Sequence, residues 1–87
     1  HFGIEIKGQR TKNFWRFEER EPKPEMYYAF VYVPEDEIPQ VFILDSLTTM
    51  TLWREYKQKS KATRNNQWGI NWKQPHDFKD RFDLLPQ

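Results

Sequence analysis

The chain has 87 residues, no cysteine, and 14 lysines and arginines against 13 aspartates and glutamates, for a formal net charge of +1. This composition excludes disulfide bonds and thiolate metal sites, and the net charge identifies no partner by itself. No apolar run approaches the roughly 20 residues of a membrane span, so no membrane partner is expected. Residues 1–87 are expected to be one small domain or the C-terminal fragment of a larger one, in a reducing compartment such as the cytoplasm.

Residues 2–8 are predicted to form a strand, because apolar and polar side chains alternate along them. The alternation places an apolar set on one face, with Ile6 pointing into the core, and a polar set on the other face. A carboxylate two residues before a lysine on one strand face is a compact way to hold a hard metal ion beside a fixed positive charge. The polar set is Glu5, Lys7 and Gln9.

The following segments extend the predicted sheet. Residues 14–18 alternate again, which predicts a short strand that could pair with the first, and residues 19–25 carry prolines among charges and form a loop. Residues 26–33 are apolar or aromatic throughout, as in a strand buried on both faces. A short connection to a strand at residues 40–44 favours an antiparallel hairpin.

The second half of the chain is predicted to be mainly helical. Asp45 or Ser46 can cap a helix that extends to about residue 61. A short strand at residues 69–73 and a short amphipathic helix at residues 76–85 follow. Strands followed by helices indicate an α+β fold, with a small mixed, mostly antiparallel sheet, one main helix and a short C-terminal helix. The stripe of the main helix that should face the core is Leu47, Met50, Trp53 and Tyr56.

Basic residues gather in two acid-free segments, one near the start of the chain and one at the end of the main helix. Such residues can contact the phosphate backbone of DNA without reading its sequence. A solvated charge run is the commoner explanation, and cations at a helix C-terminus also favour the helix dipole. The candidates are Arg10, Lys12, Lys57, Lys59, Lys61 and Arg64.

The serial order of these pieces is distinctive. It comprises a Glu-x-Lys strand, a Trp-containing strand, a Tyr-Tyr-Ala-Phe-Val-Tyr-Val strand, a hairpin into Phe-Ile-Leu, a helix, and a closing Phe-x-Asp-Arg-Phe-Asp-Leu-Leu-Pro. Over most of the chain this order resembles the C-terminal half of PD-(D/E)xK, or restriction-endonuclease-like, nuclease domains. Each motif is weak alone. The resemblance implies a restriction-endonuclease-like core and metal-dependent hydrolysis of DNA phosphodiester bonds.

The resemblance also implies roles for the polar set. Glu5 would bind a divalent metal, magnesium or alternatively manganese, and Lys7 would be the catalytic lysine that orients the attacking water and stabilises the developing phosphate charge. Gln9 would contact the substrate or the groups around the metal. The family pattern also needs an aspartate on a preceding strand, which this chain, starting at His1, does not contain. We therefore expect the chain alone to be inactive or nearly so.

The rival interpretation is a non-catalytic α+β module that binds another protein or nucleic acid, including homodimerisation through a sheet edge left without its neighbour. Under that interpretation, Glu5 and Lys7 are ordinary surface charges whose pairing is worth well under ~1 kcal/mol. Glu18 or Glu19 would reach the proposed metal only if residues 14–18 pair with the first strand. Metal binding that depends on Glu5 favours the nuclease, and a dimer through residues 2–8 favours the rival.

Overall fold

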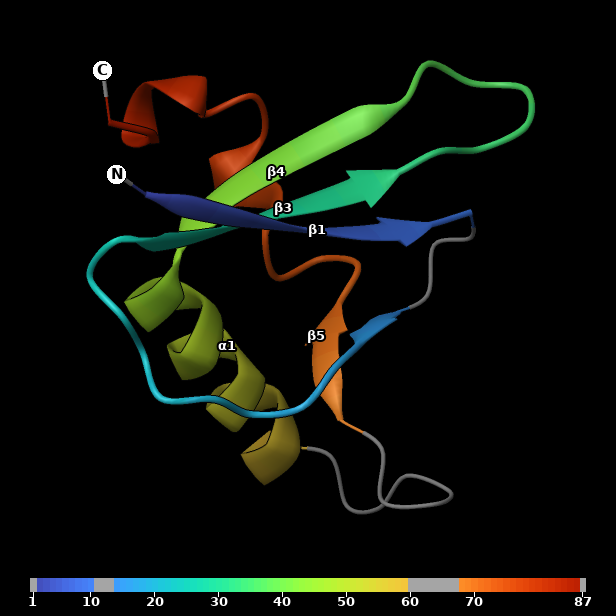
Figure 1. Ribbon diagram of the computed structural model, residues 1–87. Helices are drawn as coiled ribbons and strands as arrows, with labels where there is room; N and C mark the ends of the chain where they lie inside the picture. The colour runs from blue at the N-terminus through green and yellow to red at the C-terminus, as the bar shows by residue number, and fades with distance from the viewer. Residues whose placement is uncertain (1, 11–13, 60–67, 87) are drawn as a thin grey trace.

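The computed structural model describes residues 2–10, 14–59 and 68–86. They form a three-stranded mixed sheet, a two-stranded antiparallel ribbon, one main helix and two short 3-10 turns, so the α+β prediction is confirmed (Figure 1). No helix in these ranges is long and apolar enough to cross a membrane. The elements are β1 (Gly3–Gln9), β2 (Phe14–Arg16), β3 (Met26–Tyr32), β4 (Gln40–Asp45), α1 (Ser46–Lys59), β5 (Gly69–Asn71), η2 (His76–Phe78) and η3 (Phe82–Leu84).

Strand β3 lies at the centre of the larger sheet, whose order is β1-β3-β4. β4 pairs with β3 antiparallel through the predicted hairpin, whereas β1 runs parallel to β3. Every residue of β3 is buried or half-buried, which explains why its sequence is apolar or aromatic throughout. The parallel register places Glu5 beside Tyr28 and Lys7 beside Phe30. This register decides which face of β1 meets the core.

The ribbon consists of β2 and β5. Pairing of residues 14–18 with the first strand, which the sequence allowed, is therefore not observed. Trp15 explains the outcome, because its side chain is 3% exposed and its ring packs against Phe30 and Phe42 in the core. Gly69 of β5 lies against the backbone of Trp15, where a Cβ atom would overlap the Trp15 carbonyl oxygen. The ribbon therefore depends on a glycine at this position.

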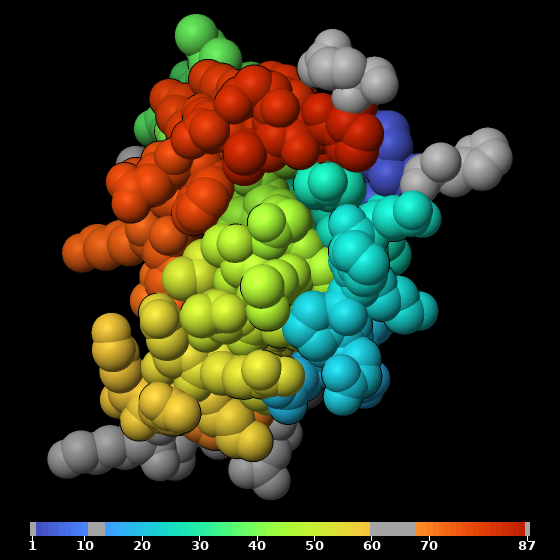
Figure 2. Space-filling view, turned by 90° about the vertical axis from the view of Figure 1, so that its left-hand side faces the viewer, coloured from blue at the N-terminus to red at the C-terminus, as the bar shows by residue number. Residues whose placement is uncertain are grey.

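Helix α1 begins at a side-chain cap. The Oδ1 atom of Asp45 accepts a hydrogen bond from the backbone N–H of Thr48 at 2.6 Å, which selects Asp45 over Ser46 as the cap. Ser46 is buried, and its Oγ atom accepts a hydrogen bond from the backbone N–H of Lys23 at 3.0 Å. This bond ties the crossover segment, residues 17–25 between β2 and β3, to the start of the helix. Figure 2 shows these residues beside the outer face of α1.

The buried face of α1 differs in part from the predicted stripe. Met50 and Trp53 are buried as expected, whereas Leu47 is 63% exposed, so its assignment to the core is wrong. Thr49 occupies the buried position instead, and its hydroxyl donates to the backbone oxygen of Asp45 at 2.8 Å. A polar side chain can be buried there because the preceding turn of the backbone satisfies its hydroxyl group.

The segment at residues 76–85 forms the two 3-10 turns instead of the predicted short helix. Asp80 lies between them with φ of 56°, a left-handed conformation that interrupts a right-handed helix. The backbone N–H of Asp80 donates to the Val41 oxygen at 2.9 Å, and Lys79 forms a β-bridge with Phe42. The chain therefore runs along the outer edge of β4 and covers it.

Candidate functional site

The polar face of β1 is the face that meets the core side of the sheet. The exposed fractions of Ile4 and Ile6 are 43% and 70%, so the prediction that Ile6 points into the core is wrong. Parallel pairing places the odd-numbered residues of β1 beside Tyr28 and Phe30, whose side chains belong to the core cluster. The side chains of those odd-numbered residues therefore lie on the core side of the sheet, beneath the crossover segment. The half-buried polar residues are Glu5, Lys7 and Gln9.

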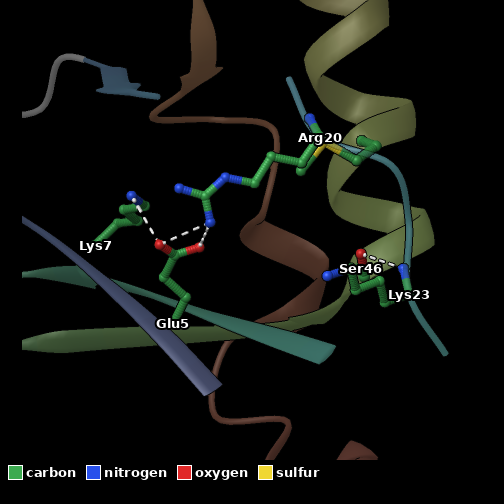
Figure 3. Close-up of polar contacts among 6 residues, drawn as sticks. Glu5, Lys7, Arg20, Lys23 and Ser46 are labelled. Atoms are coloured by element: carbon green, nitrogen blue, oxygen red, sulfur yellow. Dashed lines mark hydrogen bonds and ion pairs between the residues drawn. The ribbon is translucent and has the colours of Figure 1, made fainter. Parts of the chain in front are cut away.

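Three charged side chains meet on this face, and we call them the Glu5 cluster: Glu5, Lys7 and Arg20. Nη1 of Arg20 donates to both carboxylate oxygens of Glu5, at 3.1 and 2.9 Å, and Nζ of Lys7 lies 3.5 Å from Oε1 (Figure 3). The Lys7 ammonium also lies 5.7 Å from the ring centroid of Phe17, a cation–π distance. One carboxylate is thus held between two cations from different parts of the chain.

Arg20 reaches Glu5 from the crossover segment. Its backbone N–H contacts the Sδ atom of Met50, a buried residue of α1, at 3.4 Å. Glu18 and Glu19 are the acids of this region that could have approached a metal bound to Glu5, but the residue that contacts Glu5 is the cation Arg20. Glu19 forms an ion pair with Arg54 of α1 instead. No motif in the sequence marks Arg20, because its position follows from the path of the crossover.

Gln9 connects β1 to the ribbon. Its Nε2 atom donates to the backbone oxygen of Phe14 at 3.1 Å. Together with Lys7 and Arg16, it lines a cavity of about 490 Å³ between β1 and β2. The Glu5 cluster therefore has a polar, cation-lined space beside it.

The described residues contain no group of three or more His, Asp or Glu side chains that could hold a metal ion. The Glu5 carboxylate is an oxygen ligand of the kind that Mg²⁺ prefers, and Mg²⁺ usually keeps several waters with one or two carboxylates. Arg20 now occupies both oxygens of Glu5, so a metal would have to displace its guanidinium. Among these groups, Glu5 alone could supply a carboxylate ligand to a magnesium ion.

The three predicted phosphate contacts that the structure describes do not gather at the Glu5 cluster. Lys57 and Lys59 lie at the C-terminal end of α1, which Figure 1 places at the end of the helix away from β1. The Lys57 ammonium lies 5.5 Å from the ring centroid of Trp53. Arg10 follows β1 and lines a separate cavity with residues 33–35. The other candidates, Lys12, Lys61 and Arg64, lie outside the described residues.

Tyr28 lies beneath the cluster, opposite Glu5 in the strand register and only 2% exposed. Burial raises the pKa of its phenol, because the charged phenolate loses hydration. The negative charge of Glu5 raises this pKa further, whereas the positive charge of Arg20 lowers it. The phenol therefore remains neutral beside the carboxylate.

The raised pKa of Tyr28 predicts a loss of stability at high pH. The unfolded phenol titrates near pH ~10, so the stabilising contribution is complete below that pH and is lost as pH rises through the folded pKa. We expect the free energy of unfolding to fall above about pH 10 more steeply in the wild type than in Tyr28→Phe. Urea unfolding followed by tryptophan fluorescence across this range measures both slopes. Tyr27→Phe, at a half-buried position, is the control, and equal slopes in wild type and Tyr28→Phe contradict the prediction.

Comparisons of the chain with protein-family models, with curated proteins and with solved structures found no match. Its function is therefore inferred from the Glu5 cluster and the surfaces around it.

Proposed function

We propose that this chain carries the Glu-x-Lys half of a metal-dependent nuclease site that acts on the DNA backbone. The observation that supports the proposal is the Glu5–Lys7 pair. The two residues occupy alternate positions of β1, the Lys7 Nζ atom lies 3.5 Å from the Glu5 Oε1 atom, and Lys7 lines a polar cavity. Glu5 would bind Mg²⁺ or Mn²⁺, and Lys7 would stabilise the charge that develops on the phosphate. A cation can stabilise developing charge in this way only if its side chain is kept in position. The Lys7 side chain is kept in position by its cation–π contact with Phe17 and its ion pair with Glu5.

The neighbouring arginines suit a phosphodiester substrate. Arg16 lines the cavity that also contains Lys7, and Arg20 contacts the Glu5 carboxylate. The planar guanidinium group can contact two phosphate oxygens at once, a geometry that lysine lacks. Displaced from Glu5 by a metal ion, the Arg20 side chain would remain near the scissile phosphate. Arg20 would thus exchange a carboxylate partner for a phosphate partner.

The site needs a further ligand, because the described residues contain no group of three or more acidic or histidine side chains that could hold a metal ion. A strand added along the outer edge of β1 could supply one, because that edge adjoins the Glu5 cluster. For the 87-residue chain as a monomer, we expect weak metal binding and little or no DNA cleavage. Cleavage by a monomer that Glu5→Gln abolishes would overturn the expectation of inactivity.

The proposal is tested by metal binding. Titrated Mn²⁺, which is paramagnetic, should broaden the amide NMR signals of β1 residues around Glu5 in the wild type. Glu5→Gln removes the charged ligand and should weaken this binding by at least about tenfold, equivalent to ~1.4 kcal/mol. Glu37→Gln removes an equally charged but exposed side chain in the β3–β4 connection and should change nothing. Equal broadening in wild type and Glu5→Gln would refute Glu5 as the metal ligand.

A further inference from the structure

The two outer edges of the larger sheet differ. Lys79 and Asp80 cover the β4 edge through a β-bridge and a backbone hydrogen bond. Among the described residues, no strand pairs with the outer edge of β1, which lies in front of the sheet in Figure 1. Natural proteins usually protect such an edge, because its unpaired backbone groups can accept another strand.

The hydrogen bonds at both ends of β1 identify the residues whose backbone points outward. The N–H of Gly3 donates to the Glu25 oxygen, and the Gln9 oxygen accepts from the N–H of Val33, each at 2.8 Å. Because a parallel strand alternates the direction of its backbone groups, odd-numbered residues of β1 bond to β3. Ile4, Ile6 and Gly8 therefore present N–H and C=O groups to the open edge.

The side chains beside this edge do not protect it. Phe2, Ile4 and Ile6 are 41%, 43% and 70% exposed, in a row along one face. The charged residues of β1, which could repel an approaching strand, point to the opposite face and are already paired with each other. The edge thus combines free backbone groups with exposed apolar side chains.

We propose that a second copy of this chain adds to the sheet here, with the two β1 strands antiparallel about a twofold axis at Ile6. In such a dimer, the residues whose backbone groups point to the open edge must face one another across the interface. The symmetric registers are therefore those in which each even-numbered residue of β1 lies opposite an even-numbered residue of the partner's β1. The register centred on Ile6 places Glu5 opposite the partner's Lys7 and pairs all of β1, from Gly3 to Gln9. Registers centred on Glu5 or on Lys7 place like charges directly opposite each other, which is unfavourable.

The apolar face fits the same register. Ile6 would lie against the partner's Ile6, and Ile4 would lie opposite the partner's Gly8. No atom lies within 4 Å of the position that a Cβ would take at Gly8, so the partner's isoleucine has room there. Charge, backbone and side-chain volume therefore select one register.

The dimer also bears on the metal site, a consequence that rests on the proposed function. Glu5 and the partner's Glu5 would be diagonal neighbours across the axis, with backbones about 7–8 Å apart. Glutamate side chains are long enough to share one cation at that separation. The second copy would then supply a second carboxylate beside Glu5.

Sedimentation of the wild type over a range of concentrations should show a mass that rises from 10.8 kDa toward twice that value. Glu5→Lys alone and Lys7→Glu alone should each weaken the dimer by about tenfold or more, because each places like charges opposite one another. The double exchange Glu5→Lys with Lys7→Glu restores opposite charges and should restore the dimer. Glu5→Gln removes the metal ligand without placing like charges opposite one another, so a Glu5→Gln dimer that binds no metal separates the two proposals.

Disulfide trapping tests the register without changing a charge, since the chain has no cysteine. Facing residues of a hydrogen-bonded antiparallel pair have Cα atoms about 5.5 Å apart, within disulfide range. Oxidised Ile6→Cys should form a covalent dimer, whereas Ile4→Cys, far from its own copy in this register, should not. A wild type that remains monomeric at every concentration, or equal cross-linking of the two variants, would overturn the proposed dimer.

Discussion

Gly69→Ala is expected to lower the free energy of unfolding by about 3 kcal/mol. A Cβ at position 69 would overlap the carbonyl oxygen of Trp15, which is a backbone atom of β2, the strand that pairs with β5. The ribbon cannot move apart freely, because the Trp15 ring packs against Phe30 and Phe42 in the core. Urea unfolding monitored by circular dichroism gives the free energy directly.

Gly8→Ala is the matched control for this substitution. Gly8 is also a strand glycine, but no atom lies within 4 Å of the position that its Cβ would take. We expect a change within about 1 kcal/mol at this position, where alanine has open space and a lower conformational entropy cost. A Gly69→Ala protein as stable as Gly8→Ala would show that β5 does not approach Trp15 this closely.

The sequence predicted the elements well where a local pattern determines them. The apolar run of β3 and the prolines that bound its hairpin mark the centre of the sheet, and Asp45 caps α1 through a contact three residues away. The pairing of β2 with β5 was not predictable in this way. It depends on Gly69, which lies more than fifty residues after Trp15 in the chain.

The inward face of β1 shows a second limit of local pattern. Alternation separates Ile6 from Glu5 and Lys7 but does not say which face meets the core. In this fold the register against Tyr28 and Phe30 decides it, and the charged face is the one drawn inward. The sequence therefore placed Glu5 and Lys7 correctly on one face of the strand but assigned the core to the opposite face.

The contact of Arg20 with Glu5 was not predictable from the sequence, because the path of the crossover segment places Arg20 there. Long-range contacts fix that path: the Ser46 hydroxyl accepts from the Lys23 N–H, and Met50 contacts the Arg20 N–H. Short-range spacing contains no trace of these contacts. The consequence for function is specific, since the side chain held against the Glu5 carboxylate is a cation where a metal site would have a second acid.

Reversing the charge of Arg20 should therefore create a metal site. Arg20→Glu removes the guanidinium that occupies both Glu5 oxygens and places a second carboxylate on the same segment. The lost ion pair is half-exposed and contributes only about 1 kcal/mol, so most of the gain comes from the added ligand. We expect the affinity for Mn²⁺, measured by calorimetry, to rise by at least about tenfold over the wild type.

Two further variants separate the contributions. Arg20→Gln removes the ion pair without adding a ligand and should raise Mn²⁺ affinity by no more than about fivefold, the equivalent of ~1 kcal/mol. Lys73→Glu makes the same charge change at an exposed side chain and should leave the affinity at Glu5 unchanged. If Arg20→Glu binds Mn²⁺ no better than Lys73→Glu, the crossover segment does not bring residue 20 to Glu5, and the proposed half-site loses its geometry.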